Sequence, residues 1–166
     1  LNFNLNILIA PSWNTSFFKN NYHNILFKLL SEKNVRFSIR PHPTSFTKKE
    51  VSRLELETIG YKIDDNDEID FYNFNALISD WSGIFIEFSY FQKKKAFLIN
   101  SPKKILNKYS KKYNDQSIEE YSRNKIGRVY EENSLKELVD SIASTTNKDL
   151  LKDKLEIDNF FKEYFY

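Results

Sequence analysis

The stretch NALISDWSGIFIEFSYFQKKKAFLIN, residues 75–100, contains a complete strand–helix–strand pattern. Residues 75–79 and 96–100 are short, almost wholly apolar runs, which are typical of strands buried on both faces. Between them, residues 83–92 carry apolar side chains at helical spacing. Because parallel strands need a helical crossover of this kind, the stretch predicts a βαβ unit.

Apolar runs outside this stretch predict the remaining strands of the same sheet, at residues 5–10, 35–39, 61–63 and 126–130. Strands that are nearly all apolar and alternate with amphipathic helices indicate a parallel sheet covered on both faces. With right-handed crossovers, the sequence predicts an α/β fold with a Rossmann-like, doubly wound parallel sheet.

Capping signals and apolar spacing predict where the helices begin. Thr47 with Glu50 has the spacing of a capping box, as has Ser134 with Glu137. A further helix is predicted from Phe18 to Leu30, and the last twelve residues also have a helical pattern. In the Phe18 helix, His23 lies off the most apolar stripe and is expected to be partly exposed.

Length and composition limit the class of protein. A chain of 166 residues predicts one domain, and a chain that opens with Leu1 and lacks methionine is interpreted as a piece of a longer polypeptide. Without cysteine it has no disulfide framework and no thiolate nucleophile, which suits a reducing cytoplasm. No apolar run approaches the roughly 20 residues of a membrane span. The net charge of +2 favours no particular partner, and no nucleic acid is expected.

Charge is distributed unevenly along the chain. Residues 64–70 hold five acids, whereas residues 93–112 hold eight lysines and no acid. Two interpretations stay open for the lysines. They form a solvated face, or they face anionic lipid or a phosphate-rich polymer, which implies peripheral contact with a membrane.

Three loops follow predicted strands at the edge of the sheet where ligands bind: PSWN at 11–14, RPHP at 40–43 and SDWSG at 79–83. At the carboxyl ends of parallel strands the loops diverge and helix N-termini point free N–H groups inward. The RPHP loop is stiff because prolines flank His42, which stands beside Arg40 and suits binding or protonating a phosphate oxygen. The alternative is a surface turn.

The SDWSG loop has the composition of an anion site at a helix N-terminus. Ser82 is the expected N-cap, and Gly83 lets a ligand approach the backbone N–H groups of the first turn. Glu87 lies four residues further on the same face, at a distance suited to ribose hydroxyls. The alternative, in which Ser82 only caps the helix and Glu87 is solvated, stays open on spacing alone.

Other chemistries lack their motifs. The sequence has no GxGxxG, no GxxxxGK[ST] and no GxSxG, so it predicts no dinucleotide fingerprint, P-loop or hydrolase elbow. Two distant histidines and no cysteine argue against a structural zinc site. The three loops hold no carboxylate cluster, so no metal cofactor is expected.

In this order, ILIAPSWN, RPHP and NALISDWSGIFIEFSYFQKKKAFL resemble the C-terminal half of the CDP-glycerol glycerophosphotransferase family, the teichoic-acid and capsule polymerases with a GT-B fold. The match covers residues 5–100 in order. Trp81 stands where the family more often has tyrosine, and Gly83 where a second serine is common. The same turn is also similar to that of nucleotide-sugar epimerases and glycosyltransferases of this fold, so the donor stays open between a CDP-alditol and a nucleotide sugar.

The resemblance implies that residues 1–166 are the donor-nucleotide-binding domain of a two-domain transferase that builds a cell-surface polymer. It implies a catalytic contact between His42 and the donor phosphates, and a ribose contact for Glu87. The other implied substrate-binding residues are Ser12, Trp13, Arg40, Ser79, Asp80, Ser82 and Gly83.

The resemblance also implies the partners and the location. The partners are a nucleotide-activated donor such as CDP-glycerol, a polymer acceptor and an N-terminal acceptor domain that is absent from this sequence. That domain carries the family's general base, so the fragment is expected to be inactive alone, with no cofactor beyond the donor. The expected location is the cytoplasm, at the inner face of the membrane. Two alternatives stay open: half of a nucleotide-sugar epimerase, and a non-catalytic nucleotide-binding or interaction module.

Overall fold

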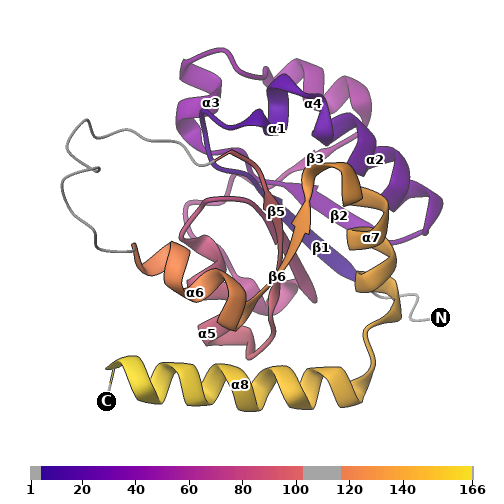
Figure 1. Cartoon of the computed structure of the whole chain (residues 1–166). Coiled ribbons are helices and arrows are strands. Elements are labelled where there is room, and N and C mark those ends of the chain that lie inside the picture. The colour runs from indigo at the N-terminus through magenta and orange to yellow at the C-terminus, as the bar shows by residue number, and fades with distance from the viewer. Residues whose placement is uncertain (1–4, 103–116, 166) are drawn as a thin grey trace.

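A six-stranded parallel sheet forms the centre of the molecule (Figure 1). The computed structural model describes residues 5–102 and 117–165. The strands are β1 (Asn6–Ala10), β2 (Arg36–Ile39), β3 (Lys62–Ile63), β4 (Ala76–Ser79), β5 (Ala96–Asn100) and β6 (Gly127–Glu131). Their order is β3-β2-β1-β4-β5-β6, and every neighbouring pair is parallel. The predicted Rossmann-like, doubly wound sheet is therefore confirmed.

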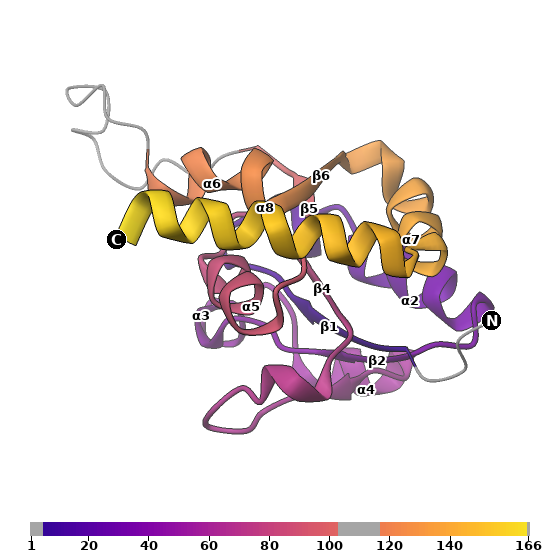
Figure 2. The same cartoon turned by 90° about the horizontal axis from the view of Figure 1, so that it is seen from below.

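Helices cover both faces of this sheet. They are α1 (Ser16–Lys19), α2 (Tyr22–Glu32), α3 (Pro43–Thr47), α4 (Arg53–Ile59), α5 (Ile84–Gln92), α6 (Ile118–Ile126), α7 (Leu135–Ser144) and α8 (Asn147–Phe165), with the 3₁₀ helices η1 (Phe71–Asn73) and η3 (Glu132–Ser134). Side chains of β1 alternate between two cores. Ile7 and Ile9 pack with α2 and α7, whereas Leu8 and Ala10 pack with α5 and α8. Figure 2 shows α2 and α7 on one side of the sheet and α5 on the other, with α8 running across the molecule from α7.

The capping box predicted for Thr47 and Glu50 is wrong. A helix begins earlier, with His42 as its N-cap and Pro43 as its first residue, and Thr47 is its last residue. It ends there because Lys49 has a left-handed backbone, with φ 56°. Glu50 instead accepts a hydrogen bond from the backbone N–H of Asn14 (2.8 Å).

Ser52 and Glu55 form the capping box of this region, at the start of α4, and Gly60 ends that helix in a left-handed conformation (φ 110°). A second difference is the break between α1 and α2, where Asn21 also has a positive φ of 57°. Asparagine tolerates this conformation better than most residues. The predicted Ser134 box also fails, because the Ser134 side chain makes no cap hydrogen bond to α7.

His23, expected to be partly exposed, is buried, with 1% of its surface accessible. α2 begins after the break at Asn21, and the His23 ring in its first turn packs against Phe18 of α1, with ring centroids 5.3 Å apart. Its Nε2 lies 3.4 Å from the Glu55 carboxylate on α4. The correction shows that a single helical stripe is a poor guide where two short helices meet.

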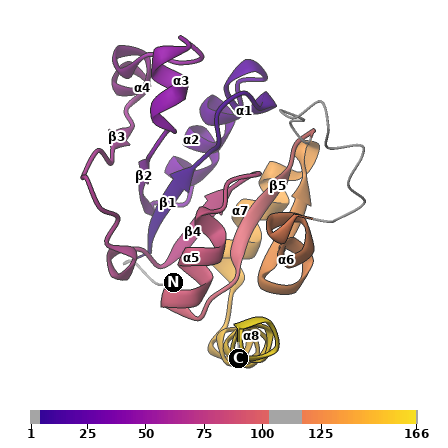
Figure 3. The same ribbon diagram turned by 90° about the vertical axis from the view of Figure 1, so that its left-hand side faces the viewer.

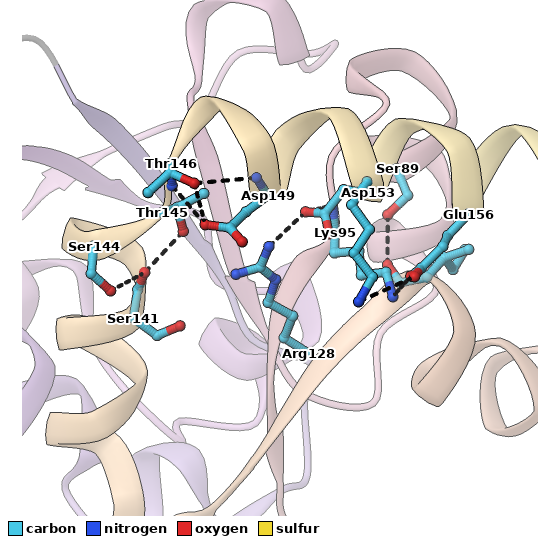
Figure 4. A network of polar contacts seen from close by, with 12 residues as sticks. Ser89, Lys95, Arg128, Ser141, Ser144, Thr145, Thr146, Asp149, Asp153 and Glu156 are labelled. Carbon is cyan, nitrogen blue, oxygen red and sulfur yellow. Dashed lines mark hydrogen bonds and ion pairs between the residues drawn. The ribbon is translucent and has the colours of Figure 1, made fainter.

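The helix α8 closes the sheet at the amino ends of its strands. Figure 3 shows α8 end-on, at the opposite end of the molecule from α1 and α3. Arg128, the second residue of β6, donates to Asp153 (2.9 Å), and Lys95, just before β5, pairs with Glu156 (Figure 4). Thr146 and Asp149 cap the start of the same helix.

This docking involves part of the lysine stretch. Lys93 pairs with Asp158 (3.0 Å) and Lys95 with Glu156, so these two lysines are held by acids of α8. Residues 103–112 of the stretch lie outside the described residues. Within residues 5–102 and 117–165, no helix is long and apolar enough to cross a membrane.

Candidate functional site

The loops after β1, β2 and β4 lie along the carboxyl edge of the sheet, as the parallel order requires. The order reverses between β1 and β4, whose chains continue toward opposite sides, and such a switch point is where ligands bind in open α/β sheets. Two hydrogen bonds join the loops there. The N–H of Ser12 donates to Asp80 Oδ1 (2.8 Å), and Ser79 Oγ donates to the Ala10 carbonyl (2.7 Å).

Ser79 and Asp80 form the floor of this switch point. Ser79 exposes only 2% of its surface, and Asp80 exposes 0%. Burial raises the pKa of Asp80, and the hydrogen bond from the Ser12 N–H opposes that rise. Both side chains therefore fasten β4 to the β1 loop, and their contact with a ligand stays a prediction.

The buried Arg123 of α6 contacts the SDWSG turn from inside the domain. This contact was not predicted from the sequence. Arg123 exposes 3% of its surface, donates to the carbonyls of Asp80 and Ile99 (3.1 Å to the second), and lies 4.0 Å from the centroid of the Trp81 ring. Burial lowers the pKa of its guanidinium, and the nearby Asp80 charge raises it. The positively charged guanidinium of Arg123 thus contacts the backbone of the SDWSG turn at Asp80. No local motif could have predicted it, because 43 residues separate Arg123 from Asp80.

Gly83, rather than Ser82, is the N-cap of α5, which corrects the predicted role of Ser82. Ser82 Oγ accepts from the Ile84 N–H only at the long distance of 3.5 Å. Gly83 has φ −63°, which any residue adopts, and an added Cβ would lie 3.7 Å from the nearest described atom, Glu119 Oε1. Neither backbone conformation nor packing among the described residues requires a glycine here. Its lack of a side chain leaves the N-terminus of α5 open.

Two carboxylates flank this helix start. Glu87 lies one turn into α5, is exposed, and forms no hydrogen bond or ion pair with the described residues, so its contact with a ribose stays a prediction. Glu119 of α6 was not predicted, and its carboxylate lies beside Gly83. An anion at this helix start would bind on the side away from Glu119, because an ionised carboxylate repels it, whereas a hydroxyl group beside Glu119 would donate to it.

On the β1–β2 side, Trp13 and His42 come together as predicted. Their ring centroids are 6.3 Å apart, and Lys48 Nζ lies 4.7 Å from the Trp13 ring centroid. His42 Nδ1 accepts from the Thr44 N–H (3.1 Å). An accepting Nδ1 carries no proton, so the ring in this arrangement is neutral and Nε2 carries the hydrogen. An imidazolium at His42 would break the cap of α3.

Arg40 does not join this group. Its guanidinium donates to the Asn66 carbonyl (2.8 Å) and lies 3.5 Å from Asp64 Oδ2. It therefore faces the acidic loop after β3, where Asp65 and Asp67 also line a small cavity. Arg40 and His42 separate because β2 ends at Ile39 and α3 begins directly after His42, so the two residues do not share an extended strand.

The loops after β5 and β6 border a wide cavity of about 920 Å³ at the same edge. Its lining residues are Tyr22, Ile25, Trp81, Asn100, Ser101, Pro102, Glu131, Glu132, Asn133, Leu135 and Lys136. Trp81 of the SDWSG loop is among them, and the other predicted site residues are not. The rule that ligands bind at carboxyl ends, applied to the fifth and sixth strands as well, would have pointed to this region. In the part of the chain that the structure describes, no group of three His, Cys, Asp or Glu residues could hold a metal ion.

The fold and the carboxyl-edge site define a Rossmann-like α/β domain, and comparison with solved structures finds the same fold in TagF, a wall teichoic acid polymerase. A TagF variant soaked with CDPG is 17% identical, with a TM-score of 0.57 over 96% of this chain and 37% of that chain. A second TagF variant is 18% identical, with a TM-score of 0.55 over 99% of this chain and 40% of that chain. The expected likeness to one half of a GT-B fold is thus confirmed.

A third TagF structure, also soaked with CDPG, is 19% identical, with a TM-score of 0.51 over 98% of this chain and 37% of the other. At these identities the likeness concerns the fold. The chain spans about two-fifths of the length of these polymerase chains. No family model matches the sequence, and no curated protein matches it at a significant level.

Proposed function

We propose that this chain is the donor-nucleotide-binding domain of a transferase that builds a cell-surface polymer from a CDP-alditol or a nucleotide sugar. The observation that carries the proposal is Gly83. It leaves the start of α5 open at the carboxyl edge, although neither its φ of −63° nor its packing among the described residues requires a glycine. The fold shared with a teichoic acid polymerase supports the same conclusion.

The residues around the switch point divide the work of holding a nucleoside diphosphate. The N–H groups at the start of α5, the imidazole of His42 and the ammonium of Lys48 are the groups proposed to contact phosphate oxygens. Trp13 offers an aromatic face to the base, and the exposed Glu87 accepts hydrogen bonds from ribose hydroxyls. The buried guanidinium of Arg123 adds positive charge on the inner side of the SDWSG turn.

In the transfer reaction, these groups stabilise the negative charge that develops on the departing nucleotide. Donors that are already in place need no reorganisation when the charge appears. The acceptor hydroxyl would be held close to the donor by the domain that precedes this one in a two-domain transferase. This domain alone is expected to bind the donor and to transfer little.

Calorimetric titration of the purified domain with CDP, CDP-glycerol, UDP and UDP-glucose tests the proposal. Saturable binding of one nucleotide family is expected. A cytidine preference favours the CDP-alditol transferase, and a uridine preference favours a sugar transferase or an epimerase half. Failure of all four to bind would contradict the proposed function, and would leave an interaction module as the better interpretation.

The proposal includes a cytoplasmic location at the inner face of the membrane, where lysines of residues 93–112 would contact anionic lipid. Co-sedimentation with vesicles containing phosphatidylglycerol, at low and high salt, checks this part. Binding that weakens with salt is expected. No binding at either salt concentration would remove membrane contact without affecting the nucleotide site.

A further inference from the structure

The cavity bordered by the loops after β5 and β6 is a second compartment of the carboxyl edge. Its volume of about 920 Å³ lies within the range of small-molecule sites, roughly 300–1,000 Å³. It begins at Trp81, one side of which is covered by Arg123, and extends to α7. The cavity therefore adjoins the SDWSG turn without sharing the residues proposed to hold the phosphates.

The lining combines apolar walls with groups that accept hydrogen bonds. Trp81, Tyr22 and Leu135 supply the apolar surface. Asn100 and Glu131 lie opposite each other at the ends of β5 and β6, joined by a hydrogen bond of 2.9 Å. Carboxylates only accept hydrogen bonds, so they suit hydroxyl groups and repel phosphate.

Glu132 adds a second carboxylate to the same wall. It accepts a hydrogen bond from Ser16 Oγ and lies close enough to Tyr22 to raise the pKa of that phenol, after the larger effect of burial. The single lysine among the lining residues, Lys136, is exposed at the start of α7. The wall formed by β6 and η3 is thus predominantly acidic.

Ser101 gives an independent indication of a ligand. It lines the cavity, exposes 3% of its surface, and its Oγ has no hydrogen-bond partner among the described residues. The Ser101 carbonyl accepts from Trp81 Nε1 (2.6 Å), which holds the residue in place. A buried hydroxyl without a partner is uncommon in proteins, and a rotation of the Ser101 side chain toward the cavity would let a polar ligand supply one.

The two ends of the carboxyl edge also differ in charge. Lys48 lies at the β1–β2 end, whereas the carboxylates of Glu119, Glu131 and Glu132 lie toward α6 and β6. A donor that places its diphosphate at the first end would direct its uncharged part toward the second.

We infer that this cavity binds an uncharged, polyhydroxylated group, namely the alditol or sugar carried by the donor or presented by the acceptor. Apolar faces of Trp81 and Tyr22 cover its C–H surfaces, and Glu131, Asn100 and Ser101 bond its hydroxyls. The link to a nucleotide rests on the proposed function, whereas the affinity for polyols does not.

Calorimetry on the whole chain and on three variants tests this inference. Ser101→Ala and Glu131→Ala remove proposed hydroxyl contacts, and Glu137→Ala is the control because it removes an equally exposed carboxylate of α7 that does not line the cavity. The ligands are CDP-glycerol, CDP-ribitol and UDP-glucose, each paired with its nucleoside diphosphate, together with free ribitol and free glucose. Ser101→Ala is expected to fold normally, because the hydroxyl it removes is unpaired.

Each result decides between the sources of the polyol. If the donor supplies it, one linked nucleotide binds about tenfold tighter than its nucleoside diphosphate, and Ser101→Ala and Glu131→Ala remove this preference while Glu137→Ala keeps it. If the acceptor supplies it, only free ribitol or glucose binding is lost in those two variants. Should Ser101→Ala and Glu131→Ala bind every ligand as the unaltered chain does, the inference is wrong.

A complete failure of CDP and UDP to bind would contradict the proposed function alone. The cavity would then be judged by the free polyols, with the amide signals of Ser101 and Glu132 and the indole signal of Trp81 as local probes in a nuclear magnetic resonance titration. Shifts at these three positions support the polyol site. Shifts at none of them, up to the solubility of ribitol and glucose, overturn it.

Discussion

The two edges of the sheet are built for different purposes. At the amino edge, charges meet partners: Arg128 pairs with Asp153, and Lys95 pairs with Glu156 (Figure 4). At the carboxyl edge, Ser101 Oγ is buried without a partner among the described residues, and the start of α5 stays open at Gly83. One edge uses its polar groups to hold α8 in place, and in the proposed function the other edge binds the ligand.

The largest expected effect is on stability, at the amino edge. Arg128→Ala leaves Asp153, whose side chain is only 7% exposed, without its guanidinium partner. We expect a loss of about 3 kcal/mol in the free energy of unfolding, measured by urea denaturation at pH 7, with nucleotide affinity unchanged. Replacing both partners, by Met at Arg128 and Leu at Asp153, should recover most of the loss. A nucleotide affinity that falls with Arg128→Ala would contradict the separation of the edges.

Glycines at the two edges form the next comparison. A Cβ on Gly127, at the start of β6, would lie 2.5 Å from Leu98 Cδ1 and 2.6 Å from the Arg123 carbonyl oxygen. Gly127→Ala should therefore cost about 2 kcal/mol of stability.

Gly83→Ala should leave the thermal midpoint nearly unchanged and weaken CDP or UDP binding about tenfold, because a methyl group would cover the N–H groups of α5. If Gly83→Ala binds CDP and UDP with unchanged affinity, neither nucleotide binds at the start of α5.

His42 separates a structural role from a binding role within the carboxyl edge. Its Nδ1 caps α3, so His42→Ala should cost about 1 kcal/mol, while His42→Asn keeps a capping oxygen. If the ring contacts phosphate, both variants lose about tenfold in nucleotide affinity. If only His42→Ala loses affinity, the ring serves the cap and the prediction of a phosphate contact is wrong. Thermal melts and calorimetry on the same samples distinguish these outcomes.

The smallest effect concerns pH at the amino edge. The hydrogen bond from Lys95 holds the pKa of Glu156 below its usual value, so this pair stabilises the fold above the pKa of the unfolded carboxyl, and the contribution is lost as pH falls through the lowered pKa. With the Glu156 side chain 40% exposed, Glu156→Gln should cost about 0.5 kcal/mol at pH 7. The difference should vanish once the pH lies below the lowered pKa of Glu156. A difference independent of pH would show that the pair contributes through packing rather than charge.

Much of the fold could be predicted because local apolar patterns in the sequence indicate most of its strands and helices. The strands β1, β4 and β5 are short apolar runs, and their parallel order follows from the helices between them. Helix boundaries differ from the prediction where two capping signals lie close together in the sequence. His42 and Pro43 start a helix before the Thr47 signal, and Lys49 ends it through a backbone conformation that residue type does not predict.

The candidate site was predicted in part for a related reason. Trp13, His42 and Gly83 lie in loops that follow strands, and Glu87 lies in the first turn of the helix after β4, so the topology places them at one edge. Arg123 reaches the turn from a distant helix, and Arg40 turns away toward Asn66. Tertiary contacts of this kind leave no mark on local spacing.

The central claim is that the carboxyl edge, and not the amino edge, receives the nucleotide. The most direct test is a ¹H–¹⁵N chemical-shift titration of the domain with CDP and, in parallel, with UDP. We predict that one of them shifts the amides of Ser12, Trp13, His42, Gly83 and Ile84, while those of Lys95, Arg128 and Asp153 stay unchanged. Shifts concentrated at Lys95, Arg128 and Asp153, or no shifts with either nucleotide, would contradict it.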